Sequence, residues 1–80
     1  MNFDINWTNT AVKQLRKIDK FHQKKIVAAI FTLEDLATAK QVKTLINHQY
    51  SYRLRVGNYM VLFDVDTVVR IIDIQEIKKT

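Results

Sequence analysis

The sequence contains no cysteine and no proline, and it has a single glycine, Gly57. The absence of cysteine excludes disulfide bonds and thiolate metal sites, and it fits a reducing compartment. We find no segment with the composition of a linker and no internal repeat, so we expect one domain over residues 1–80. The first ten residues lack the basic-then-apolar order of a signal peptide, and no apolar run approaches the roughly 20 residues that cross a bilayer. We therefore expect a cytoplasmic protein without a membrane partner.

Positive charge dominates the composition. Thirteen lysines and arginines stand against eight acidic residues, which gives a net charge of +5 and a pI near 9.7. In so short a chain this balance favours a polyanionic partner such as nucleic acid or the ribosome, or an acidic protein. The alternative interpretation is that the charge serves solubility alone. The hydrophobic fraction of 48% is ordinary for a globular protein and argues against disorder.

The first half of the chain has one strand pattern and two helix patterns. Residues 3–7 alternate apolar and polar side chains, which predicts a short strand with one buried face. Residues 8–10 supply helix-capping side chains, and apolar residues then recur at helical spacing over residues 11–18. A second amphipathic helix is predicted to begin near His22. The short connection at residues 19–21 indicates that the two helices pack antiparallel as a hairpin.

The second half of the chain is predicted to be β. Residues 50–56 and 59–63 form two strands joined by a two-residue turn, Gly57–Asn58, of the kind that hairpins prefer. After a reversal at residues 64–67, residues 68–77 form a nearly continuous apolar strand that we expect inside the sheet, covered on both faces. The fold class is therefore predicted to be α+β, with an antiparallel four-stranded sheet, the helical hairpin on one face and the order β-α-α-β-β-β.

The hairpin register brings two arginines together. If Gly57–Asn58 is the turn, Arg55 lies opposite Met60 and Arg53 lies opposite Leu62, on the face away from the helices. The opposite face then holds the apolar and aromatic side chains of both strands, namely Tyr52, Leu54, Val56, Tyr59, Val61 and Phe63. The direction of Tyr50, at the end of the strand, stays open.

Arg53 and Arg55 are two residues apart on one strand face, a separation of about 7 Å. Cations this close repel each other unless an anion lies between them, and a phosphate fits the fork of a guanidinium group. The alternatives are a solvated strand face or a partial pairing with Asp64, which is worth only about 0–1 kcal/mol at a surface.

Other candidate residues are scattered along the chain. His48 precedes the hairpin and has a side chain suited to proton transfer near neutral pH, although we favour the interpretation that it is an ordinary loop histidine. Arg16 and Lys17 are candidates for a secondary basic patch. Lys78 and Lys79 follow the last strand, either as a solubilising tail or as cations at the rim of the arginine face. The histidines and carboxylates show no metal-binding spacing, so we expect neither a metal nor a cofactor.

The segment from Tyr52 to Phe63, YRLRVGNYMVLF, closely resembles the hairpin of the RelE/ParE superfamily of bacterial toxins. The helix start at residues 11–15 and the approach Val42-Lys43-Thr44-Leu45 are similar as well, so the resemblance covers essentially the whole chain. It implies the toxin half of a type II toxin–antitoxin pair. The implied partners are a cognate antitoxin and, only through the antitoxin complex, operator DNA.

The RelE-like branch implies a ribosome-dependent endonuclease that cuts messenger RNA without a metal and so inhibits translation. In that branch Arg53, Arg55 and Lys79 would stabilise the scissile phosphate. Proton transfer would fall to another group of the protein, with His48 and Glu76 as the local candidates, or to ribosomal RNA supplied by the target. The residues expected to contact RNA are Lys78, Lys43, Arg16 and Lys17.

The resemblance also implies two alternatives. One is a ParE-like inhibitor of DNA gyrase without nuclease chemistry, and the other is a catalytically weakened relative that acts through antitoxin or operator binding. Met60 favours these alternatives, because the superfamily commonly has arginine at its position. The family also commonly carries aromatic or basic residues just beyond the last strand, where this sequence ends at Thr80.

Overall fold

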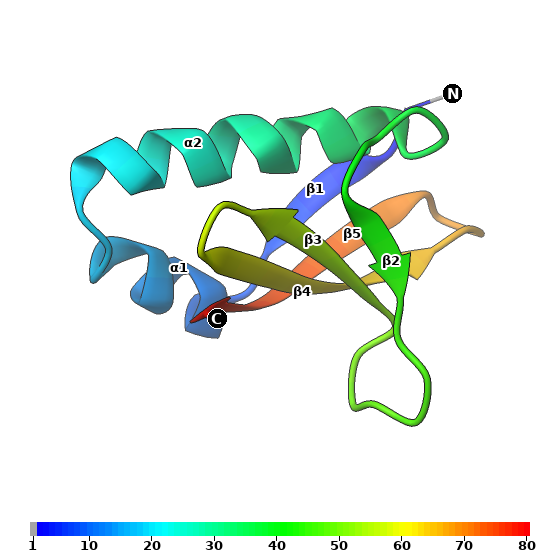
Figure 1. Cartoon of the computed structure of the whole chain (residues 1–80). Coiled ribbons are helices and arrows are strands. Elements are labelled where there is room, and N and C mark those ends of the chain that lie inside the picture. Colours follow the sequence, from blue (N-terminus) through cyan, green and yellow to red (C-terminus); the bar gives the residue numbers. More distant parts are fainter. Residues whose placement is uncertain (1) are drawn as a thin grey trace.

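Two α-helices lie against one face of a sheet in the computed structural model, which describes residues 2–80 (Figure 1). In chain order the elements of this range are β1 (Asp4–Trp7), α1 (Asn9–Arg16), α2 (Lys20–Phe31), a 3₁₀ helix (Thr32–Asp35), β2 (Val42–Thr44), β3 (Tyr52–Val56), β4 (Tyr59–Asp66) and β5 (Ile71–Lys79). α1 packs against β5 and α2 packs against β3, so the two helices cover different strands of the sheet. The predicted α+β class is confirmed.

The sheet of residues 2–80 has five strands in the order β1-β5-β4-β3-β2. β1 is parallel to β5, and every other neighbouring pair is antiparallel. The prediction of four antiparallel strands therefore missed β2 and the parallel pairing. β2 has only three residues, two of them exposed, so it shows too little alternation to be recognised from sequence. The parallel pairing arises because the chain crosses over through the helices before it returns to β5.

The central hairpin has the predicted register. Arg55 pairs with Met60, Arg53 with Leu62, and the apolar residues of both strands pair on the other face. Gly57 begins the turn with a φ of 57°, in the region that primed hairpin turns require and that glycine adopts without strain.

Side-chain caps fix the starts of both helices. The Thr8 hydroxyl accepts a hydrogen bond from the Ala11 backbone N–H at 3.2 Å, and the Asp19 carboxylate accepts one from the His22 N–H at 3.1 Å. The second helix therefore begins at Lys20, slightly before the predicted start. The His22 ring nitrogen Nδ1 also lies 2.7 Å from Asp19, and these bonds lower the pKa of that carboxyl. No helix within residues 2–80 has the length and apolarity to span a membrane.

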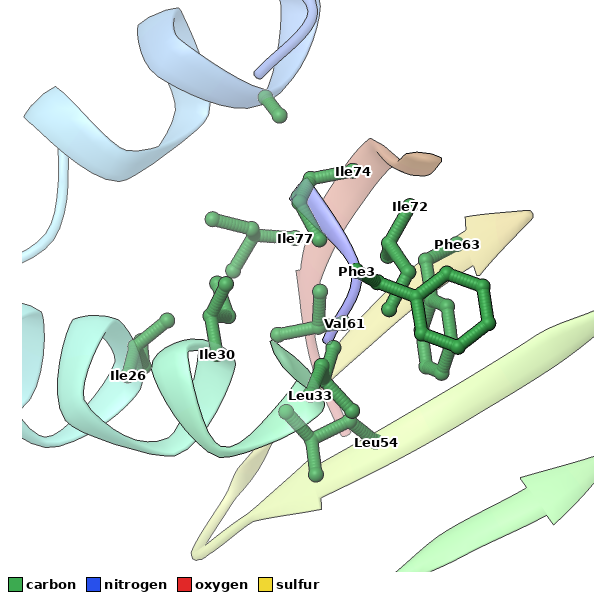
Figure 2. Close-up of a cluster of buried hydrophobic side chains, with 11 residues drawn as sticks. Phe3, Ile26, Ile30, Leu33, Leu54, Val61, Phe63, Ile72, Ile74 and Ile77 are labelled. Carbon is green, nitrogen blue, oxygen red and sulfur yellow. The ribbon is translucent and has the colours of Figure 1, made fainter. Parts of the chain in front are cut away.

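The core lies between the helices and the sheet, as Figure 2 shows for side chains from α2, β3, β4 and β5. Its side chains come from almost every element, and within the hairpin Tyr52 stacks on Phe63 with 5.5 Å between ring centroids. The buried members are Phe3, Ala11, Ile26, Ile30, Leu33, Leu54, Val61, Phe63, Ile72, Ile74 and Ile77.

The last strand begins later than predicted. Val68 and Val69 lie in the turn before β5, with exposed fractions of 89% and 58%. The Asp66 carboxylate accepts hydrogen bonds from both of their backbone N–H groups, which stabilises the turn over the extended conformation that the valines favour. β5 is internal to the sheet as expected, but the helices cover only one of its faces.

Replacement of Leu54 by alanine should lower the free energy of unfolding by about 2–5 kcal/mol, because Leu54 is 2% exposed and its removal leaves a cavity. Val68→Ala is the matched control, with an expected change within about 0.5 kcal/mol. Urea unfolding measures both variants. Equal losses of stability in the two would contradict the assignment of Leu54 to the core.

Candidate functional site

A β-bulge in β5 decides which side chains reach the open face, the face of the sheet turned away from α2. Leu62 pairs with Glu76, whereas the residue after Leu62 pairs with Ile74. Gln75 is therefore an extra residue in β5. This insertion lets Ile74 and Ile77 both point into the core although three positions separate them. Beyond the bulge, Glu76 shares the open face with its partner Leu62.

Three strands place cations on the open face. Lys43 of β2 pairs with Arg53 of β3, and Met60 of β4 lies between Arg55 of β3 and Lys78 of β5. We call Lys43, Arg53, Arg55 and Lys78 the cationic cluster. Within residues 2–80 neither arginine forms an ion pair, and Lys78 approaches a carboxylate oxygen only at 3.8 Å. The described part of the chain therefore leaves the two arginine charges without an ion-pair partner, whereas Lys78 lies near the Glu76 carboxylate.

The other end of the open face is acidic. The register places four aspartates there, namely Asp4, Asp64, Asp66 and Asp73. Asp64 accepts hydrogen bonds from the Ser51 backbone N–H at 2.8 Å and from the Gln75 side chain at 3.2 Å, and it does not pair with an arginine. The face thus attracts a polyanion at one end and repels it at the other.

Glu76 lies beside the cationic cluster in a network of hydrogen bonds. Its Oε2 accepts the Tyr50 hydroxyl at 2.8 Å, and its Oε1 accepts Nε2 of Gln14 at 3.4 Å. The Tyr50 bond is the largest cause that lowers the pKa of Glu76; Gln14, Lys78 and His48 lower it further, and burial acts in the opposite direction. The same bond raises the pKa of Tyr50. Glu76 is therefore an ionised carboxylate held in place by neutral donors.

Gln14 connects α1 to the site. Its Oε1 accepts the backbone N–H of Ile77 at 2.6 Å, at a part of β5 that lies beyond the end of β1. The amide oxygen of Gln14 thus accepts a backbone N–H of β5 that, within residues 2–80, has no neighbouring strand on that side, and the amide nitrogen donates to Glu76. This double contact fixes the strand and the carboxylate relative to α1.

His48 lies in the loop before β3, near Tyr50. Its Nδ1 accepts the Tyr50 backbone N–H at 3.1 Å, and the two ring centroids are 6.0 Å apart. In the neutral ring the proton is therefore on Nε2, because Nδ1 acts as an acceptor. The structure thus brings His48 to the edge of the site.

The remaining predicted residues lie elsewhere. Lys79 pairs with Tyr59 and so belongs to the opposite side of the sheet from the cationic cluster, whereas Lys78 joins the cluster. Arg16 and Lys17 are exposed at the end of α1 and at its cap, and within residues 2–80 no ion pair joins them to the cluster. In the same range no group of histidine and carboxylate side chains is placed to hold a metal ion.

Two residues of the site, Tyr50 and Gln14, could not be assigned to it from the sequence. Tyr50 precedes β3, which begins at Tyr52, so the strand alternation that assigns directions does not extend to it. Gln14 gave no signal, because a polar residue on an amphipathic helix is ordinarily solvated. The bulge is visible in the sequence, because the apolar residues at 72, 74 and 77 depart from the two-residue alternation of a regular strand.

The sequence matches the family model described as the ParE toxin of the type II toxin–antitoxin system parDE over residues 5–78. No curated protein matches the chain significantly.

Several solved structures share the fold. The toxin–antitoxin complex RelBE2 from Mycobacterium tuberculosis has a chain that is 19% identical with a TM-score of 0.85, and the match covers 100% of both chains. A chain of the archaeal RelE–RelB complex from Pyrococcus horikoshii is 24% identical with a TM-score of 0.82, over 99% of this chain and 96% of that one. A chain of the intact RelBE complex from E. coli is 14% identical with a TM-score of 0.79, over 98% and 96%. At these identities the likeness establishes the fold.

Replacement of Tyr50 by phenylalanine should raise the pKa of Glu76 toward its ordinary value, because the variant lacks the hydroxyl donor. A carboxyl whose pKa is lowered by folding contributes stability above its unfolded pKa, near 4.5, and loses this contribution as the pH falls through the folded value. Tyr50→Phe should therefore destabilise the protein at about pH 7 and much less at about pH 3.

Carboxyl ¹³C NMR and urea unfolding at the two pH values measure these effects. Tyr52→Phe is the matched control, because within residues 2–80 the Tyr52 hydroxyl forms no hydrogen bond and its ring packs on Phe63. A loss of stability by Tyr50→Phe that is equal at both pH values would contradict the assigned bond.

Proposed function

The chain belongs to the ParE toxin family of type II toxin–antitoxin systems, and we propose that it acts as a toxin that cleaves messenger RNA on the ribosome and so inhibits translation. The observation that carries this proposal is the cationic cluster on the open face, in which Arg53 and Arg55 have no carboxylate partner within residues 2–80. A surface of this kind fits the phosphate groups of an RNA strand.

The cluster has the chemistry that phosphodiester cleavage needs. When the ribose 2′-oxygen attacks the neighbouring phosphorus, negative charge builds up on the phosphate oxygens. Fixed guanidinium groups at Arg53 and Arg55, together with the ammonium group of Lys78 across β4, stabilise this charge more in the transition state than in the ground state. Lys43 extends the contact to a neighbouring phosphate. Arginine does not accept a proton, so the proton of the 2′-hydroxyl has to go to another group.

The proposed protein partner is a cognate antitoxin. Three of the similar structures are described as complexes of a RelE toxin with a RelB antitoxin. In our proposal an acidic segment of the antitoxin covers the cationic cluster and thereby occupies the phosphate sites. Any contact with operator DNA is made through this complex.

A second candidate function is inhibition of DNA gyrase by binding alone. Met60 favours it, because an apolar side chain lies at the centre of the row between Arg55 and Lys78, where a phosphate would gain from a third cation. The description of the matching family as ParE toxins of parDE systems also favours it.

Arg53→Ala and Arg55→Ala should each reduce messenger RNA cleavage by about 100-fold or more, since each removes a preorganised contact to the transition state. The test expresses the protein without an antitoxin, maps the 5′ ends of cellular messenger RNA and measures gyrase supercoiling in parallel. Lys24→Ala, an exposed charge change on α2, is the matched control and should leave cleavage intact. Intact messenger RNA together with inhibited supercoiling would favour the second candidate.

Met60→Arg should increase cleavage by about tenfold, because it adds a cation between Arg55 and Lys78 on the open face. Met60→Leu controls for the loss of the thioether at similar volume and should cleave like the wild type. Cleavage rates on purified ribosomes measure both. An unchanged rate in Met60→Arg would show that this position does not contact the scissile phosphate.

A further inference from the structure

Glu76 occupies a position that the stabilisation of charge alone does not explain. It pairs with Leu62 from one side while Arg53 pairs with Leu62 from the other, and it is two residues from Lys78. A carboxylate at this place weakens the binding of a polyanion, yet its oxygens are held by Tyr50 and Gln14. Each carboxylate oxygen has two acceptor sites. Oε1 also faces the Lys78 ammonium group at 3.8 Å, whereas Oε2, which within residues 2–80 accepts only the Tyr50 hydroxyl, keeps one site for a further proton donor.

We propose that Glu76 is the general base of the RNA cleavage, with Tyr50 and Gln14 as positioning residues that fix its carboxylate beside the cationic cluster. This inference rests on the proposed function. It assigns the group that takes the proton from the 2′-hydroxyl, a task that the arginines cannot perform.

The strand register places Glu76 close to the cations that would bind the phosphate. Two strand spacings separate the backbones of Arg53 and Glu76, a distance of about 10 Å, and Lys78 lies about 7 Å along the strand from Glu76. A phosphate bound by Arg53 and Lys78 therefore lies over β4. There Leu62 is only 2% exposed although it belongs to the open face, so neighbouring side chains cover it. The ribose that carries the attacking oxygen then falls within reach of Glu76.

The proposed step transfers one proton to Glu76 and replaces one phosphorus–oxygen bond with another. Glu76 accepts the proton of the 2′-hydroxyl as the 2′-oxygen forms its bond to phosphorus, and the bond from phosphorus to the 5′-oxygen breaks. The leaving oxygen takes a proton from water, and the resulting hydroxide removes the proton from Glu76. The products are a 2′,3′-cyclic phosphate and a 5′-hydroxyl end, and the carboxylate is restored.

The protonation states of the site fit this role. The bonds from Tyr50 and Gln14 lower the pKa of Glu76, so the carboxylate is ionised at neutral pH. The same shift makes it a weaker base, and its fixed position rather than its basicity suits it to accept the proton. The Nδ1 atom of His48 is occupied by the Tyr50 backbone N–H, so that nitrogen is not available to a substrate.

Glu76→Gln should slow single-turnover cleavage on ribosomes by about 10²–10⁴-fold, the usual contribution of a general base. The variant keeps a carbonyl oxygen that accepts the Tyr50 hydroxyl, so we expect it to fold and to bind RNA at least as tightly as the wild type. The decisive measurement is the pH profile between about pH 6 and pH 8.5. The wild-type rate should be flat, because its base is already ionised, whereas the rate of Glu76→Gln should rise about tenfold per pH unit as hydroxide replaces the base.

Three further variants complete the test. Glu76→Asp should restore part of the rate with a flat profile. Tyr50→Phe should lower the rate by a smaller factor, also with a flat profile, because it loosens the base without removing it. Glu34→Gln, which neutralises an exposed carboxylate of the 3₁₀ helix, is the matched control and should cleave like the wild type.

Two outcomes would overturn the inference in different ways. If the wild type cleaves and Arg53→Ala does not, but Glu76→Gln cleaves within threefold of the wild type with a flat profile, Glu76 is not the base and the proposed function stands. A uniform loss of rate without a change in the pH slope would likewise assign a structural role to Glu76. If the wild type does not cleave RNA at all, the proposed function fails and this inference fails with it.

Discussion

The hydrogen bonds around the bulge at Gln75 determine how the sheet, α1 and the open face fit together. Thr8 ends β1 and donates its hydroxyl to the Ile74 carbonyl at 2.7 Å, so the parallel pairing stops just before the bulge. Beyond it, Gln14 takes the place of a neighbouring strand by accepting the Ile77 N–H. An uninterrupted strand would turn Ile77 to solvent and bury the charged residues on either side of it. Because of the extra residue, β5 can place Ile74 and Ile77 in the core and the charged side chains on either side of Ile77 on the open face.

The charges of the open face are separated along the strands instead of being paired. Cations gather toward the β3–β4 turn and aspartates toward the β4–β5 turn, while the helices keep the other face apolar. The charges of Arg53 and Arg55, which are two positions apart on β3, repel each other. Within residues 2–80 no carboxylate pairs with either arginine to reduce this repulsion. A bound polyanion does relieve it. The arrangement thus favours ligand binding over the stability of the free protein, as is common at functional sites.

Local chemistry predicted the parts of the structure that depend on neighbouring residues. A glycine turn set the register of Arg53 and Arg55, and helical spacing located both helices. The missed features depend on contacts between distant segments: the parallel pairing of β1, the short β2 and the capping of Val68 and Val69 by Asp66. For the site, the sequence indicated the four members of the cationic cluster, but it also indicated Lys79, which lies on the opposite side of the sheet. It could not show the anchoring of Glu76, because its donors come from α1 and from a loop without periodicity.

In the proposed function, one group on the open face, Glu76, distinguishes a cleaving toxin from one that only binds. Toxins whose sequences differ widely share the fold, so the fold does not separate the two activities. Cations on an open sheet bind any polyanion, including RNA and the acidic surface of a protein. Cleavage needs, in addition, a proton acceptor held at a fixed position among the cations, and a carboxylate there weakens simple binding. In the proposed function, the donors Tyr50 and Gln14, the second of which also supports β5 through the Ile77 N–H, hold this proton acceptor in place among the cations.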